Sequence, residues 1–142
     1  MTTKHANKPF YVQLALPVRV YDIDFAQIVS NIVYIRWLED LRTKMLDEYF
    51  PLDRQVANGY VPVLMATTIE YKRPVVMFDQ PVGHMWIKSL EKVRWINQAE
   101  IVVGGHVVAQ ATQTGVFVRL DSKRPIPIPA ELHAQFERYP AE

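Results

Sequence analysis

DIDFAQIVSN, residues 22–31, leads directly into the run IVYIRWLEDLRTKMLDEYF, residues 32–50. The apolar side chains of the second stretch recur at helical spacing, with two more that widen the stripe: Tyr34, Leu38, Leu41, Met45 and Tyr49, then Ile35 and Trp37. This pattern predicts a largely buried amphipathic helix from about Ser30 to Phe50. Ser30 is a candidate N-cap residue, and Pro51 ends the helix.

Apolar residues alternate with polar ones on both sides of this helix, which predicts strands with one buried face. The first strand is expected over Phe10–Val20. Four more are expected at Val63–Tyr71, Val82–Leu90, Arg94–Val103 and His106–Leu120. Gly104 and Gly105 predict a tight hairpin between the last two, and Pro129 can open a short final helix. The chain is therefore expected to be α+β, with a long helix on an antiparallel sheet of about five strands.

Composition limits the function classes. The chain has 142 residues, 49% of them hydrophobic and 22% charged, so a single domain spanning residues 1–142 is expected. The absence of cysteine excludes disulfides, thiolate zinc sites and a cysteine nucleophile. A net charge of +1 gives no sign of nucleic-acid binding. The four histidines lack metal-ligand spacing, so neither a metal nor another cofactor is expected.

The beginning of the chain bears on location. Residues 1–8 carry basic side chains with no apolar run behind them, so no secretory signal is expected. No apolar stretch approaches the roughly 20 residues of a membrane helix. The expected location is therefore the cytoplasm, with no membrane partner.

Two carboxylates, Asp22 and Asp24, lie where the first strand ends and shortly before the helix begins. A helix N-terminus offers unpaired backbone N–H groups and a partial positive charge, which can polarise a carbonyl oxygen. A carboxylate beside it can attack that carbonyl or activate a water molecule. Asp residues before a helix are more often caps or turn formers, and we assign that structural role to Asp22.

The region from Val20 to Arg42 resembles the hotdog-fold thioesterases of the 4-hydroxybenzoyl-CoA thioesterase type. Their pattern is matched by Asp22 and Asp24, then Val29, Asn31, Tyr34, Glu39 and Arg42. The later residues Ile69, Glu70, Tyr71, Pro74 and Asp79, and the proline-rich approach over Pro125–Leu132, are similar too. The resemblance covers nearly the whole chain in element order and is sharpest around Asp24.

The resemblance implies a hydrolase with Asp24 as nucleophile or general base on a thioester. The backbone N–H near Asn31 would polarise the carbonyl. This family usually has glycine three residues after the catalytic Asp, whereas this chain has Gln27. Glycine permits a backbone conformation that glutamine adopts only at a cost. Either the turn differs here, or Gln27 places an amide in the substrate pocket, orienting water or reducing the acyl site.

Further substrate-binding residues are carried over from the family. Tyr34 is expected to bind substrate, and Lys92 and Arg94 are expected near the coenzyme A phosphates, which attract cations. Glu39 has two interpretations: a solvated or paired helix charge, or a carboxylate that positions water.

The expected function is hydrolysis of an acyl- or aroyl-CoA thioester. Two alternatives stay open: a thioesterase acting on acyl carrier protein, and a non-catalytic acyl-binding protein of the same fold. The resemblance also implies a homodimer or homotetramer with the active site between subunits. The first and last strands are expected to leave sheet edges that a monomer would expose.

Overall fold

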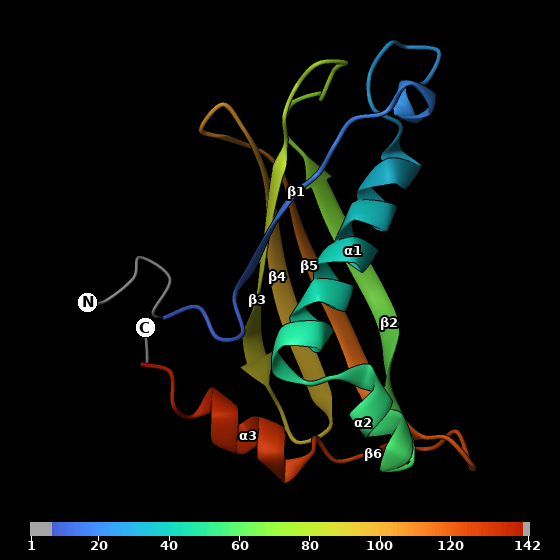
Figure 1. Ribbon diagram of the computed structural model, residues 1–142, viewed down its shortest axis with the longest axis vertical. Coiled ribbons are helices and arrows are strands. Elements are labelled where there is room, and N and C mark those ends of the chain that lie inside the picture. Colours follow the sequence, from blue (N-terminus) through green and yellow to red (C-terminus); the bar gives the residue numbers. More distant parts are fainter. Residues whose placement is uncertain (1–6, 141–142) are drawn as a thin grey trace.

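A long helix lies across one face of an antiparallel sheet in the computed structural model, which describes residues 7–140 (Figure 1). The strands are β1 (Val12–Ala15), β2 (Tyr60–Tyr71), β3 (Val82–Leu90), β4 (Arg94–Val103), β5 (His106–Arg119) and β6 (Pro125–Ile126). The helices are α1 (Asn31–Tyr49), α2 (Leu52–Ala57) and α3 (Ala130–Phe136), with a 3-10 turn at Val20–Asp22. The α+β prediction is confirmed. Most of residues 1–8, where no secretory signal is expected, lie outside the described range.

Helix α1 has the limits that its sequence predicts, with Ser30 as N-cap and Phe50 as C-cap. Ser30 takes the extended backbone of a cap, but its side chain makes no capping hydrogen bond. The predicted stripe is buried at Tyr34, Trp37, Leu38, Leu41 and Met45. Ile35 does not widen it, since this residue is 41% exposed.

Strands β3 and β4 have the predicted limits, and the glycine hairpin after β4 has positive φ at both glycines. The predicted strand over residues 10–20 is mostly wrong: β1 has only four residues. It begins after Phe10, whose φ is +57°, and the chain later winds into the 3-10 turn. Helix α2 and the two-residue β6 were not expected. Gly59, at φ +87°, turns the chain from α2 into β2.

The strand order is β1-β3-β4-β5-β2, with β6 paired to β5. The edges of the sheet are therefore β1 and β2. The expectation of an edge at the last long strand is wrong, because β5 lies between β4 and β2. Strand β2 pairs with β5 along eleven register positions, and its other side faces no described strand. Val63 and Met65 of this edge strand are 39% and 66% exposed.

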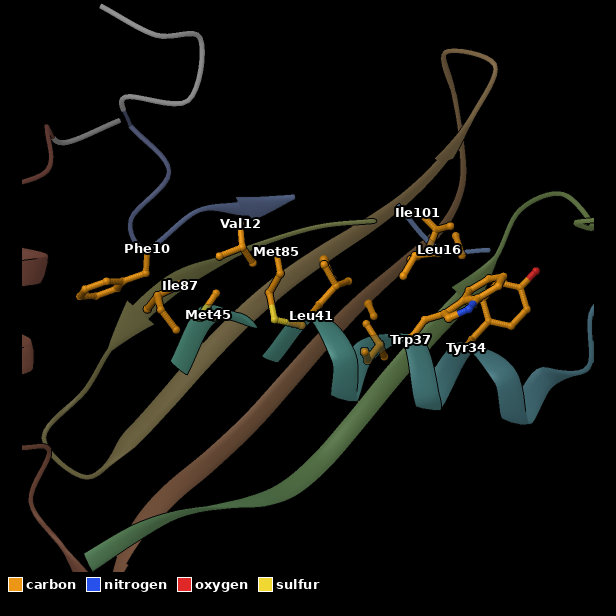
Figure 2. Close-up of a cluster of buried hydrophobic side chains, with 14 of the residues drawn as sticks. Phe10, Val12, Leu16, Tyr34, Trp37, Leu41, Met45, Met85, Ile87 and Ile101 are labelled. Atoms are coloured by element: carbon orange, nitrogen blue, oxygen red, sulfur yellow. The ribbon is translucent and has the colours of Figure 1, made fainter. Parts of the chain in front are cut away.

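The hydrophobic core fills the space between α1 and the sheet (Figure 2). Tyr34 and Trp37 lie at the end where α1 begins, and Phe10, Ile87 and Met45 at the opposite end. Close approach requires glycine at one point under the helix. A Cβ on Gly83 would lie 2.8 Å from a Leu41 methyl group, which is closer than Cβ atoms in proteins approach other heavy atoms. No helix within residues 7–140 is long and apolar enough to cross a membrane.

Candidate active site

A tight turn holds Asp24 beside the start of α1. Ile23 and Val29 form an antiparallel bridge. Inside that bridge the Asp24 N–H donates to the Ile28 carbonyl at 2.9 Å, and the Gln27 N–H donates to the Asp24 carbonyl at 2.9 Å. Residues 24–28 thus form a small closed loop at the end of the molecule where α1 begins (Figure 1). Asp24 therefore keeps a defined position close to the helix N-terminus.

Gln27 has a φ of +65°, in the left-handed region that favours glycine. The loop thus keeps the backbone conformation that a glycine would adopt here without strain. The sequence allowed two explanations for Gln27: a different turn, or an amide placed in the substrate pocket. This geometry argues against a different turn. The side chain of Gln27 is exposed, so its predicted contact with substrate requires a molecule that covers this loop.

The carboxylate of Asp24 has one satisfied and one available oxygen. Its Oδ1 accepts the Ala26 N–H at 2.8 Å. Its Oδ2 has no hydrogen-bond partner among the described residues. Asp24 is partly exposed, so this oxygen can reach a substrate or a water molecule.

Asp22, by contrast, is only 3% exposed. Its Oδ2 accepts the Arg19 N–H at 2.9 Å, and its carbonyl accepts the Ser30 N–H at 2.9 Å. The Arg36 guanidinium lies 3.7 Å from its Oδ1. These contacts tie the turn to the helix start, in agreement with the structural role assigned to Asp22.

The first turn of α1 presents backbone N–H groups next to this loop. Asn31 is its first residue and is exposed. Because the Ser30 hydroxyl makes no cap, it does not occupy the donors of the first turn. Unpaired N–H groups and the partial positive charge of a helix N-terminus suit a developing oxyanion.

A family model for the thioesterase-like superfamily matches residues 18–136. The chain belongs to this superfamily. The matched region contains the Asp24 loop, α1 and the whole sheet from β2 to β6. The resemblance seen in the sequence is therefore confirmed at the level of the family.

Named proteins agree with this membership. The chain is 27% identical over 129 residues to the long-chain acyl-CoA thioesterase FadM of Escherichia coli, covering 89% of this chain and 98% of that one. The crystal structure of YbaW, a probable thioesterase from Escherichia coli, superposes with a TM-score of 0.81 at 27% identity, covering 89% and 97%. A DHNA-CoA thioesterase from Staphylococcus aureus has the same fold, with a TM-score of 0.81 at 15% identity and coverage of 90% and 89%.

Tyr34 is placed in the core of this thioesterase-like domain rather than on its surface. Its ring packs edge-on against Trp37 and Tyr71, at centroid distances of 5.1 and 4.9 Å. Burial, and then the nearby Tyr71, raise the pKa of its hydroxyl, which hydrogen-bonds with the Val75 backbone. The Val75 carbonyl in turn accepts the Val29 N–H at 2.8 Å. Through Val75, Tyr34 is thus linked to Val29, which closes the Asp24 loop. Tyr34 also lines a small cavity under α1.

Lys92 and Arg94 lie at the opposite end of the sheet from Asp24 within one subunit. Lys92 lies in the β3–β4 turn and Arg94 begins β4. This turn is near α2 and α3, whereas the Asp24 loop is at the other end of α1 (Figure 1). Arg94 pairs with Glu91 at 3.4 Å, and the Lys92 carbonyl accepts the Ile128 N–H at 2.9 Å. The structure therefore brings Asp24, Gln27 and Asn31 together but leaves these two cations distant.

Glu39 pairs with Arg42 one turn along α1, with Oε1 2.7 Å from Nη2. This agrees with its interpretation as a paired helix charge. Groups of His, Asp or Glu able to hold a metal ion are absent from residues 7–140.

Exposed aromatic residues near Asp24 went unnoticed in the sequence. Phe25 is 100% exposed and Phe78 is 88% exposed, the latter at a φ of +75°. Val20, Tyr21 and Ile32, which are close to Asp24 in sequence, are also exposed apolar residues. Large exposed apolar groups around a polar site are typical of a surface that another molecule covers.

Proposed function

We propose that this chain hydrolyses acyl-CoA thioesters and that Asp24 is its catalytic carboxylate. The observation that carries the proposal is the free Oδ2 of Asp24, held by the closed loop beside the uncapped start of α1. Membership of the thioesterase-like superfamily supports the reaction class. The similarity to FadM, whose name gives long-chain acyl-CoA as substrate, supports coenzyme A as the thiol carrier.

Two routes use the same atoms. In the first, Oδ2 attacks the thioester carbon, the carbon–sulfur bond breaks, and coenzyme A leaves as the thiolate. Water then hydrolyses the resulting anhydride, and a proton released in that step converts the thiolate to the thiol. In the second, Oδ2 takes a proton from a water molecule that attacks the thioester carbon. In both routes the first-turn N–H groups near Asn31 stabilise the oxyanion. A single turnover in ¹⁸O-labelled water detects the first route when water attacks the Asp24 carboxyl carbon of the anhydride, because the product then carries an unlabelled Asp24 oxygen and Asp24 takes up the label.

We place the complete site between two subunits. The open side of β2 offers unpaired backbone groups together with exposed Val63 and Met65, and such edges are normally covered. Antiparallel pairing of two β2 strands would place the partner's β3–β4 turn at the same end as Asp24. Lys92 and Arg94 of that turn would then approach the coenzyme A phosphates. The proposal includes a dimer, or a tetramer of two such dimers, in the cytoplasm.

The alternatives differ in their measurable behaviour. A thioesterase for acyl carrier protein would require a broad basic docking face, and a net charge of +1 does not favour one. A non-catalytic protein would not need a pre-formed Asp24 loop. Here the loop is kept even though Gln27 must adopt a left-handed φ, which does not favour this alternative.

A hydrolysis screen with purified protein and short, long, branched and aromatic acyl-CoAs tests the proposed function. We expect saturable release of coenzyme A from at least one class. Turnover only with acyl carrier protein thioesters would favour that alternative. Binding without turnover of any thioester would favour the non-catalytic one.

A further inference from the structure

The Asp24 loop is tied to a distant part of the chain through Val29. Val29 pairs with Ile23 in the bridge that closes the loop, and its N–H donates to the Val75 carbonyl at 2.8 Å. Val75 lies in the segment between β2 and β3, residues 72–81, which passes the same end of the molecule (Figure 1). Val29 and Val75 are 1% and 0% exposed. Because both residues are buried in close packing, the position of Val75 sets the position of the pair that closes the loop.

Tyr34, one turn into α1, holds Val75 from the other side. Burial and then the nearby Tyr71 raise the pKa of its hydroxyl, whereas a hydrogen bond with the Val75 backbone lowers it. A hydrogen bond that lowers the pKa of a phenol is donated to the phenol oxygen, so the Val75 N–H is the donor. Both backbone polar groups of Val75 are therefore used, the N–H by Tyr34 and the carbonyl by Val29.

The ring of Tyr34 is itself held between the helix and the sheet. It packs edge-on against Trp37 of α1 at a centroid distance of 5.1 Å, and against Tyr71, the last residue of β2, at 4.9 Å. Such edge-to-face pairs are favourable, and Figure 2 shows Tyr34 and Trp37 together at the end of the core where α1 begins. The hydroxyl is thus a fixed point against which Val75 is held.

Burial separates Tyr34 from the substrate. The residue is 3% exposed. The cavity beside its ring offers about 10 Å³, which is roughly the space of one water molecule, so an acyl group does not fit there. The groups proposed to meet the thioester are Asp24 Oδ2 and the first turn of α1. An effect of Tyr34 on the reaction must therefore pass through Val75 to the Asp24 loop.

We propose that Tyr34 is a positioning residue for the hydrolysis. Through Val75, its hydroxyl holds the Asp24 loop so that Oδ2 and the first-turn N–H groups of α1 face the thioester together. This role rests on the proposed function, because it presupposes that Asp24 carries the reaction. A displacement of about 1 Å in a reacting group can reduce the rate on the order of 10²-fold, so a hydroxyl that never touches the substrate can still affect turnover.

Tyr34→Phe removes the hydroxyl and leaves the ring in its packing against Trp37 and Tyr71. We expect kcat with the best acyl-CoA substrate to fall about five- to twentyfold, with KM within about twofold of the parent. Circular dichroism and thermal unfolding check that the variant is folded. An unchanged kcat, or a rise in KM that accounts for the whole loss, would overturn the proposal.

Tyr49→Phe is the matched control on the same helix. The Tyr49 hydroxyl donates to the Tyr11 carbonyl at 2.6 Å, and burial raises its pKa as it does for Tyr34. This variant also loses one hydroxyl bond to the backbone of another segment, but at the last residue of α1, far from the Asp24 loop. We expect some loss of thermal stability and a kcat within about twofold of the parent. Equal falls in kcat in both variants would mean general loosening of the fold and would overturn the proposal.

Amide hydrogen exchange tests the same link without any substrate. The Val29 N–H is bonded to the Val75 carbonyl, and the Asp24 N–H to the Ile28 carbonyl at 2.9 Å. In Tyr34→Phe the Val29 and Asp24 amides should exchange at least about fivefold faster than in the parent, because the loop opens more often without its anchor. In Tyr49→Phe both amides should keep the parent rates. Unchanged exchange in Tyr34→Phe would overturn the proposal.

Asp24→Asn separates the positioning role from the proposed function. If Asp24→Asn loses turnover and Tyr34→Phe keeps it, Asp24 stands as the catalytic carboxylate and only the positioning role fails. If exchange responds to Tyr34→Phe but Asp24→Asn keeps the parent turnover, the proposed function fails, and the positioning role fails with it. Loss of turnover in both variants, with faster exchange in Tyr34→Phe alone, is the result that we expect.

Discussion

Asp22 and Asp24 are two residues apart on one turn, and their carboxylates have opposite surroundings. Asp22 is buried and bonded to the Arg19 N–H, whereas Asp24 is partly exposed and keeps Oδ2 free of any described partner. The same functional group therefore holds the turn at one position and remains available for chemistry at the other. This difference provides an internal control for the catalytic assignment.

Gln27→Gly should stabilise the protein. A non-glycine residue in the left-handed region costs about 1–2 kcal/mol, and glycine loses part of that gain through the entropy of the unfolded chain. We expect the free energy of unfolding to rise by about 0.5–1 kcal/mol, measured by urea denaturation. Gln27→Ala should give no such gain, because alanine keeps the strain. Equal stability of the glycine and alanine variants would contradict the backbone argument.

Ionisation of the Tyr34 hydroxyl should lower the free energy of unfolding at alkaline pH. Burial raises the pKa of its hydroxyl above the ordinary value, so folding favours the neutral phenol. For such a group the stabilisation is complete below the unfolded pKa, near pH 10, and is lost as pH rises through the folded pKa. Thermal unfolding from pH 8 to 11 should show a steeper loss in the parent than in Tyr34→Phe. Identical pH profiles would exclude Tyr34 as a contributor.

Met65→Glu should weaken self-association. Met65 lies on the open edge of β2 and is 66% exposed, so a charge there would be buried against a partner strand. Sedimentation should show a shift toward monomer at micromolar concentration, with a parallel loss of hydrolysis. Leu52→Glu, at an exposed apolar position on α2, is the control and should leave the mass unchanged. A fully active monomeric parent would contradict a site formed between subunits.

Lys92→Ala or Arg94→Ala should raise KM more than it lowers kcat, by about three- to tenfold per charge at low salt. The effect should shrink as salt screens the phosphates. Lys123→Ala, another exposed cation, is the comparison. If both changes leave KM untouched, the phosphate site lies elsewhere.

Local sequence patterns explain most of the elements. The period of the α1 stripe and the alternation in β3 and β4 are set by neighbours within a few residues, and those limits are confirmed. The lateral order of strands depends on contacts between distant segments, so the edge strand β2 could not be identified from the alternation. Helix α2 has only six residues, too few to show a helical period.

The residues singled out beyond the fold also include a part that local sequence predicts and a part that depends on contacts between distant segments. The Asp24 loop is local and was predicted from ten consecutive residues. The apolar cavity that is lined by Arg42 of α1 and Asn97 of β4 instead depends on how the helix packs over the sheet. One signal was present in the sequence: Asn97 interrupts the alternating apolar face formed by Trp95, Ala99 and Ile101. A polar residue at such a position indicates a buried hydrogen-bond partner or a ligand.

The most direct test of the account is the turnover of Asp24→Asn beside Asp22→Asn, using the best acyl-CoA substrate. Asp24→Asn removes the charge from the free carboxylate, so kcat should fall on the order of 10²–10⁴-fold with the fold intact. Asp22→Asn should instead lower the free energy of unfolding by about 1 kcal/mol and leave kcat within a few-fold of the parent. A folded Asp24→Asn variant that hydrolyses the substrate within a few-fold of the parent rate would contradict the catalytic role of Asp24.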